Sequence, residues 1–165
     1  EIWREIPGAR AETVFTESWY GGLFALDAGD PLDRGFWDQV IAARAAIGPA
    51  LETARQAGRI GASLDAELEL YGTDELLETL GRLGDELRFA LIVSDVRLHP
   101  LAARPDDTSD TELDGLAVRV IASEHTKCVR CWHHRADVGV NSEHPELCGR
   151  CVENVAGGGE RRRFA

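Results

Sequence analysis

Two pairs of cysteines near the C-terminus constrain this chain more than any other feature. Each pair has the C-x2-C spacing, Cys128 with Cys131 and Cys148 with Cys151, and sixteen residues separate the pairs. One such turn can place two thiolates on one ion, and two turns complete a tetrahedron of four sulfurs. This ligand set predicts a closed structural site for one Zn2+. Iron in tetrahedral sulfur coordination and two disulfides in a secreted protein are the alternatives.

The length and composition narrow the class of protein further. A chain of 165 residues can hold one ordinary domain or two small ones. No run approaches the ~18 apolar residues of a membrane span, and the first residues lack the features of a signal peptide. Paired cysteines without a secretion signal indicate a reducing compartment and a metal, so a cytoplasmic location and no membrane contact are predicted.

The absence of methionine predicts that this chain is a piece of a longer protein. Three of its four tryptophans, Trp3, Trp19 and Trp37, lie within the first 37 positions. A small terminal segment rarely buries so much aromatic surface by itself. The tryptophans are therefore expected to pack either against chain outside this sequence or on the helix that follows.

The charge is unevenly distributed along the chain. The formal net charge is −11, yet residues 124–165 hold seven Lys or Arg against six Asp or Glu. The basic residues gather beside the cysteines and in the run Arg161-Arg162-Arg163. An acidic body with a locally basic end fits a polyanionic partner that is met at that end only. A solvated charged tail is the alternative for the arginine run.

The first half of the chain has helical patterns. A short helix is expected over residues 2–6, and a long one over 31–57 with Asp33 as its N-cap. Gly58 supplies a stop signal at the C-terminal end. Pro49 cannot donate a backbone hydrogen bond, so we expect it to kink or divide the long helix.

The middle of the chain predicts a small α+β unit, because strand and helix periods succeed one another. Leucines alternate with acidic residues in the first strand, which indicates one buried and one solvated face. The expected elements are a strand over 62–71, a helix over 74–87 capped by Thr73, a short buried run over 89–93 that Val96 and Leu98 extend, an acidic loop over 99–115 and a strand over 116–121.

Histidines close to the cysteines raise the possibility of a catalytic zinc. They are His125, His133, His134 and His144. Four thiolates already fill the tetrahedron and leave no position for water, so surface histidines are the better interpretation. No carboxylate pair has neighbours that mark an acid–base couple. The sequence gives no sign of an active site.

Two residues of the first knuckle suit RNA. Arg130 lies between the first two cysteines and Trp132 follows the second. A metal-bound knuckle fixes the backbone from which both side chains leave. Arginine can fork onto phosphate or base edges, and an exposed tryptophan can stack on an unpaired base. The alternatives are a hydrophobic plug behind the metal for Trp132 and a solvated charge for Arg130.

At these residues the chain resembles a known family. The stretch Lys127-Cys128-Val129-Arg130-Cys131-Trp132, followed by Cys148-Gly149-Arg150-Cys151, is similar to the C-terminal zinc module of bacterial isoleucyl-tRNA synthetases. The likeness extends upstream to Trp37-Asp38-Gln39-Val40 and to Ile60-Gly61-Ala62-Ser63. It implies an α+β fold in three parts: residues 1–58 as the end of the helical anticodon-binding domain, 59–122 as a junction domain, and 123–165 as a four-cysteine zinc-ribbon module with a basic tail.

The resemblance also implies a function, that of a class I aminoacyl-tRNA synthetase, which joins isoleucine to tRNA(Ile) with ATP and Mg2+. The His-Ile-Gly-His and Lys-Met-Ser-Lys-Ser signatures of its catalytic domain are absent, so this piece is expected to bind tRNA near the anticodon and to be inactive alone. Arg130 and Trp132 correspond to the family's anticodon contacts, and Lys127 and Arg150 are added as candidates. The implied partners are tRNA(Ile) and the rest of the synthetase chain, in a monomer. Gly48-Pro49 departs from the family's uninterrupted helix.

Two other interpretations remain open at the level of sequence. DNA glycosylases of the formamidopyrimidine type carry a related C-terminal zinc finger with two C-x2-C pairs about sixteen residues apart. The upstream sequence here is unlike theirs, and their strand-rich, Arg-bearing loop is missing. A purely structural zinc module for protein contacts is the third possibility.

Overall fold

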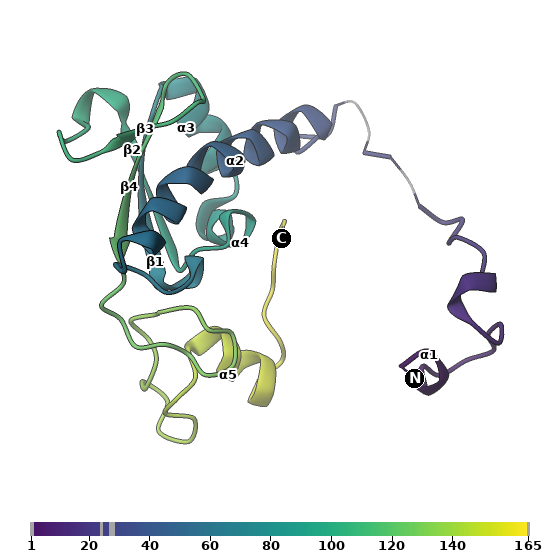
Figure 1. Cartoon of the computed structure of the whole chain (residues 1–165). Helices are drawn as coiled ribbons and strands as arrows, with labels where there is room; N and C mark the ends of the chain where they lie inside the picture. The colour runs from purple at the N-terminus through teal and green to yellow at the C-terminus, as the bar shows by residue number, and fades with distance from the viewer. Residues whose placement is uncertain (1, 24, 27–28, 165) are drawn as a thin grey trace.

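The computed structural model of this protein describes residues 2–23, 25–26 and 29–164. A four-stranded sheet with one long helix across it forms the body, and the cysteine-containing segment lies at one end of the sheet (Figure 1). The elements, in chain order, are α1 (Ile2–Glu5), α2 (Arg34–Gln56), β1 (Ala66–Gly72), α3 (Asp74–Gly81), α4 (Leu87–Leu91), β2 (Asp95–Pro100), β3 (Ser109–Asp110), β4 (Leu116–Ala122) and α5 (Gly149–Ala156). The α+β fold class predicted from the sequence is confirmed.

The long helix α2 has the ends that its sequence predicts. A side-chain oxygen of Asp33 accepts a hydrogen bond from the Phe36 amide at 2.9 Å, which satisfies one free donor of the first turn. At the other end Gly58 adopts φ +70°, and the amides of Gly58 and Arg59 close a Schellman motif on the carbonyls of Arg55 and Ala54.

Of the two effects expected of Pro49, a kink or a division of the helix, the division is wrong. The helix runs unbroken from Arg34 to Gln56 with Pro49 inside it. Proline removes a single backbone hydrogen bond, whereas the helix packs buried side chains on the core both before Pro49 (Ile47) and after it (Ala54). Tertiary packing on the sheet therefore outweighs the local penalty.

The sheet has the strand order β2-β1-β4-β3. β1 pairs in parallel with β2 and antiparallel with β4, and β3 is a short antiparallel edge of β4. The crossover between the parallel strands β1 and β2 carries α3 and α4, as a parallel pair requires. α2 and this crossover enclose one apolar core, to which β1 contributes Leu68 and Leu70 and β4 contributes Val118.

The first strand and the helix after it differ from the prediction. Residues 63–65 form a 3-10 turn, so β1 begins at Ala66. The expected single helix over 74–87 ends at Gly81, and a 3-10 turn at Gly84–Glu86 leads into a second helix. Thr73 occupies the N-cap position, but its side chain makes no capping bond.

The apolar run over 89–93 is partly helical rather than a strand. Residues 89–91 fall in α4, Ile92 caps that helix with a left-handed backbone (φ +56°), and β2 begins only at Asp95. A short apolar run cannot be assigned to helix or strand by its period alone. The predicted strand over 116–121 is correct: β4 covers it, with Leu116, Val118 and Val120 in the core.

The expected solvated face of β1 is also wrong. Every residue of β1 except Glu69 is buried, and Glu67 is only 5% exposed. Arginines from the flanking strands cover these carboxylates, since Arg97 on β2 and Arg119 on β4 both pair with Glu69. The alternation of leucine and glutamate in β1 therefore predicted a polar face correctly. Arginine side chains cover that face through ion pairs, so it is not exposed to water.

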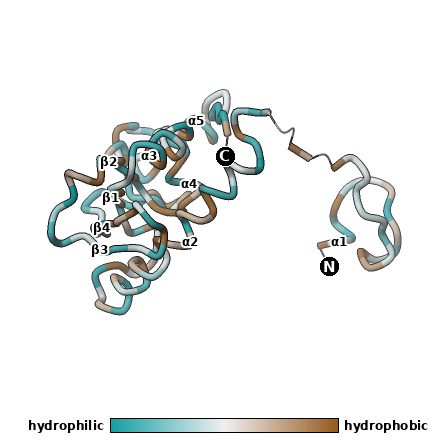
Figure 2. The backbone as a smooth tube through the Cα atoms, turned by 90° about the horizontal axis from the view of Figure 1, so that it is seen from above, coloured by the Kyte–Doolittle hydropathy of each residue, from teal (hydrophilic) through white to brown (hydrophobic). Residues whose placement is uncertain are grey.

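The N-terminal segment extends away from this body in both views (Figures 1 and 2). Trp19 is 96% exposed and Phe15 93%. Trp37, by contrast, packs against the core and makes an edge-to-face contact with Phe36. The tryptophans therefore behave differently. Trp37 packs against the core that α2 covers, whereas Trp19 is exposed and does not contact that core. None of the described helices combines the length and apolarity needed to cross a membrane.

Candidate metal centre and nucleic-acid interface

The four cysteines converge on one point in the zinc module, the name used here for residues 123–164. Their Sγ atoms all lie within 4.8 Å of one another. Cys128, Cys148 and Cys151 are buried, and Cys131 is partly exposed. Four sulfurs at about 2.3 Å from a tetrahedral Zn2+ would be about 3.8 Å apart, and the Cys131 and Cys148 sulfurs are 3.7 Å apart. The cluster is consistent with one structural zinc.

Local backbone geometry brings the sulfurs together. The Trp132 amide donates to the Cys128 carbonyl at 2.9 Å, which closes the first knuckle into a tight turn. Cys148 is the N-cap of α5 and Cys151 lies in its first turn. The Val129 amide donates to the Glu146 carbonyl at 3.2 Å and ties the two knuckles to each other. The ligand positions are thus set by a turn and a helix start.

The thiols differ in their readiness to ionise. Burial tends to raise the pKa of Cys128, but backbone N–H groups of the two knuckles outweigh it and lower that pKa to about 6. Burial raises the pKa of Cys131 and of Cys148. A cation bound among the sulfurs would favour the thiolate form of all four, because a coordinating thiol is deprotonated outright.

The histidines near the cysteines do not join the ligand group. In the part of the chain that the structure describes, the only cluster of potential metal ligands consists of the four cysteines. His133 packs edge-on against Phe89, and His134 turns toward Asp65, with 3.3 Å between its Nε2 and the carboxylate. The catalytic-zinc alternative therefore has no geometric support, because no histidine replaces a sulfur.

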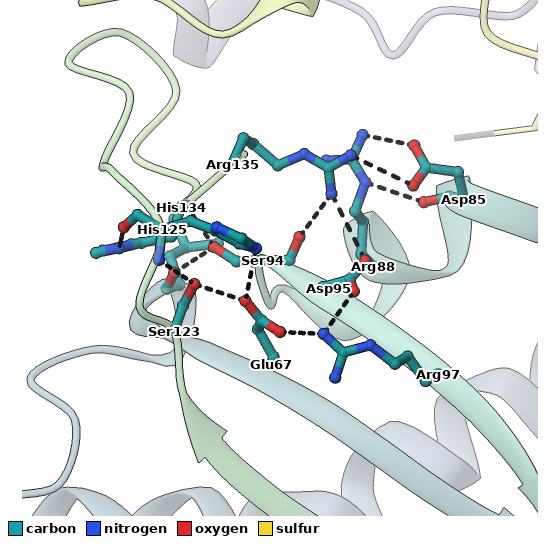
Figure 3. Close-up of polar contacts among 11 residues, drawn as sticks. Glu67, Asp85, Arg88, Ser94, Asp95, Arg97, Ser123, His125, His134 and Arg135 are labelled. Carbon is teal, nitrogen blue, oxygen red and sulfur yellow. Dashed lines mark hydrogen bonds and ion pairs between the residues drawn. The ribbon is translucent and has the colours of Figure 1, made fainter. Parts of the chain in front are cut away.

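Ser94 is the centre of the seam between the zinc module and the sheet (Figure 3). It is fully buried at the turn that precedes β2. Its hydroxyl donates to the Leu64 carbonyl and accepts the His134 amide at 2.7 Å, and its carbonyl accepts from the Arg135 guanidinium at 3.2 Å. One small side chain thus connects the module to the strand layer.

A buried carboxylate of β1 continues the seam. Glu67 accepts from the Ser123 hydroxyl at 2.7 Å, pairs with Arg97, and lies 3.8 Å from His125 (Figure 3). Burial raises the pKa of Glu67, but these hydrogen bonds and the Arg97 charge outweigh burial and hold it below the usual value. Glu67 is therefore an ionised group at the point where β4 leads into the zinc module.

The four residues predicted to contact tRNA have different surroundings. Trp132 is 61% exposed and stands on a left-handed backbone (φ +67°), so it is no plug behind the metal. Arg130 is exposed, with one guanidinium nitrogen 3.6 Å from the Cys151 sulfur. Lys127 pairs with Asp65 at 3.5 Å. Arg150 lies mostly buried, pairs with Glu160 at 3.6 Å and stacks on Phe89. Arg130, Lys127 and Trp132 are exposed, and of the three only Lys127 is held by an ion pair to another described residue.

Sequence reasoning missed the seam and the surroundings of Phe89. Ser94 had no motif around it, and its role comes from the meeting of two segments forty residues apart. Phe89 was assigned to an apolar run, yet the guanidiniums of Arg88, Arg150 and Arg162 all lie over its ring. The alternation of Glu67 and Glu69 was the one signal that pointed to a polar layer.

Comparison with known proteins places this geometry in a class. Residues 127–154, which contain all four cysteines, match the family described as zinc finger found in FPG and IleRS. The whole chain is 55% identical to isoleucine--tRNA ligase of Thioalkalivibrio sulfidiphilus, 53% to that of Nitrosococcus oceani and 50% to that of Pseudomonas paraeruginosa, and it spans 18% of the length of each relative. The chain is therefore homologous to the C-terminal region of isoleucine–tRNA ligase and carries that family's zinc finger.

Proposed function

We propose that this chain is the tRNA-binding C-terminal part of an isoleucine–tRNA ligase. The complete cytoplasmic enzyme would use ATP and Mg2+ to join isoleucine to tRNA(Ile), and this part would contact the anticodon region. The proposed division follows the sequence: residues 1–58 end the anticodon-binding helices, 59–122 form the junction and 123–165 the zinc module. The homology along the full chain supports this assignment.

The zinc would have a structural role. Cys128, Cys131, Cys148 and Cys151 are the proposed ligands, supported by their convergence within 4.8 Å. The metal supplies fixed geometry, because four thiolates complete its coordination and leave no position for a reacting water. The residues around it orient the knuckles through backbone hydrogen bonds. No chemical step is assigned to this chain.

The exposure of Trp132 is the observation that carries the proposed recognition. A bulky residue with φ +67° is strained, and only a surrounding structure that determines the backbone can hold it there. The knuckle does so, and the indole projects into solvent instead of packing. An aromatic face held in this way is suited to stacking on an unpaired base, which contributes about 1–3 kcal/mol per base. Arg130 beside it can fork onto a base edge or phosphate.

Binding assays with three nucleic acids test this function. The zinc-loaded chain is titrated with tRNA(Ile), with a tRNA of different anticodon and with duplex DNA. We expect preference for tRNA(Ile), and we expect Trp132→Ala to weaken tRNA(Ile) binding about tenfold while one zinc per chain is retained. Zinc loss in this variant would show that Trp132 is structural after all.

A second candidate function, duplex-DNA binding, is favoured only by the family match, since the matched zinc finger is also found in FPG. Tighter binding to the duplex than to either tRNA would support it and contradict the tRNA proposal. Failure to bind any of the three nucleic acids would favour the remaining interpretation, a zinc module that contacts other proteins.

A further inference from the structure

A pocket of about 480 Å³ lies between α4, the zinc module and the C-terminal tail. Phe89 on α4, Cys148 of the metal cluster and the tail residues 160–164 line it. Seven arginines line this pocket against four carboxylates, whereas the whole chain carries a net charge of −11. The lining of this pocket, called the Phe89 pocket below, is therefore positively charged although the whole chain is negatively charged.

Three of these arginines converge on one aromatic ring. The guanidinium carbons of Arg88, Arg150 and Arg162 lie 4.3, 4.9 and 4.7 Å from the Phe89 ring centroid. They come from three different segments: α4, α5 and the tail. Stacking on a ring stabilises a guanidinium and fixes its plane. Arg162 is the most exposed of the three, so its edge is the most accessible to an anion.

The carboxylates of the pocket neutralise this charge only in part. Asp85 is shared, since Arg88 pairs with it at 2.7 Å and Arg135 at 3.9 Å (Figure 3). Glu160 is shared in the same way between Arg150 at 3.6 Å and Arg162 at 3.1 Å. A zinc bound by four thiolates would add about −2 nearby, and Arg150 interacts with that charge through Cys131 and Cys151. The lining as a whole still holds seven arginines against four carboxylates, before the charge of the zinc cluster is counted.

The tail that closes the pocket is held in place. The amides of Arg163 and Phe164 each donate to the Glu86 carboxylate at 2.7 Å, and Phe164 packs against the main core. Figure 1 shows this segment returning from α5 toward α4. The side chains of Arg161, Arg162 and Arg163 are exposed, but these contacts hold the backbone of the run beside α4.

We propose that the Phe89 pocket binds a backbone phosphate of the tRNA that the zinc module contacts, an inference that rests on the proposed function. Arginine forks match phosphate oxygens, and phosphate contacts position a protein without reading sequence. The pocket adjoins the knuckle surface, because Arg130 and Arg150 both approach the same Cys151 sulfur. One strand can then place a base on Trp132 and its backbone in the pocket.

Arg162→Gln tests this site through the salt dependence of binding. Each lost phosphate contact lowers the slope of log affinity against log salt by about one. We expect Arg162→Gln to weaken tRNA(Ile) and the mismatched tRNA equally, with a wild-type-to-variant ratio that falls about threefold between 50 and 200 mM salt. An unchanged slope, or a loss confined to tRNA(Ile), overturns the phosphate role.

Arg104→Gln is the matched control. Arg104 is also half-exposed (36% against 41% for Arg162) and pairs with one carboxylate, Asp110 at 2.5 Å. It belongs to the segment between β2 and β3, which follows the end of β2, whereas the zinc module follows the end of β4. We expect it to leave affinity and slope unchanged. A loss equal to that of Arg162→Gln would indicate general charge and overturn a local site.

A second measurement separates this inference from the proposed function. Titration of the zinc-loaded chain with inorganic pyrophosphate is followed by the arginine side-chain nitrogen resonances. Saturable shifts at Arg88 and Arg162, without shifts at Arg119 on the sheet, support the pocket even where tRNA(Ile) is not preferred over the mismatched tRNA. Absence of such shifts overturns the pocket, although tRNA(Ile) binding through Trp132 would leave the proposed function intact.

Discussion

The sheet unit, residues 34–122, and the zinc module are stabilised in different ways. The sheet unit encloses one cluster of seventeen buried apolar residues, drawn from α2, both central strands and the crossover helices. In the zinc module the buried cluster is three cysteines, with Cys131, Val138 and Leu147 packed against it. A segment of about forty residues cannot bury enough apolar surface to fold by itself, so a metal replaces the core.

The geometry of the sheet unit and that of the zinc module are determined by different kinds of interaction. In the sheet unit, side-chain packing and pairing register fix positions, and a local penalty such as Pro49 is tolerated. In the zinc module, one turn and one helix start fix the sulfurs, and Trp132 is held in a left-handed conformation on the surface. The proposed recognition residues Arg130 and Trp132 leave the backbone of the first knuckle, so their positions depend on the metal site.

Cys148→Ser is expected to break the zinc module and spare the sheet unit. Structural zinc contributes an apparent 10–16 kcal/mol to the folding of zinc-finger peptides, and three thiolates cannot close the site. Zinc content should fall to zero, and amide resonances of 123–164 should collapse to the unfolded range while those of β1 and β4 persist. A zinc-loaded, folded module in this variant would refute the four-thiolate site.

Leu68→Ala should have the opposite effect. Leu68 is fully buried in the middle of β1, so truncation leaves a cavity in the sheet unit and costs about 2–5 kcal/mol of unfolding free energy. Urea unfolding followed by circular dichroism measures the loss, and one zinc per chain should remain bound below the transition. Val140→Ala, at a position 79% exposed in the zinc module, is the control and should change little.

Ser94→Ala tests the seam between the two regions. Without the hydroxyl, the His134 amide loses its acceptor in a buried position, which costs about 1–3 kcal/mol. We expect hydrogen exchange to increase at the amides of His134 and Arg135 before the sheet amides change. Ser142→Ala on the exposed module surface provides the comparison. Equal exchange in both variants would show that the two regions do not depend on this contact.

The smallest expected effect is the pH dependence contributed by Glu67. Its folded pKa lies below the unfolded value, so the folded state favours the carboxylate. The resulting stability is present above the unfolded pKa, about 4.3, and is lost as pH falls through the folded pKa. Urea midpoints between pH 7 and pH 3 should therefore fall less steeply in Glu67→Gln than in the wild type. Acid also releases zinc from both chains, so only the difference between them reports on Glu67.

The sequence by itself determined the features that depend on near neighbours. The C-x2-C spacing brings each sulfur pair together through one turn, and Asp33 and Gly58 define the ends of α2 through bonds that span a few residues. The alternation in β4 placed its apolar face correctly because one side of that strand meets α2. The candidate metal site was predictable for the same reason: its geometry is local apart from a single loop.

Tertiary structure alone decided the features in which distant segments meet. The period of residues 87–91 does not distinguish a helix from a strand, and whether Glu67 meets water depends on Arg97 and Ser123. Arg162 reaches Phe89 only because Glu86 holds the tail. The spacing of apolar and polar residues predicts which face of an element is polar. It does not predict whether water or another side chain covers that face, because the covering side chain comes from a distant part of the sequence.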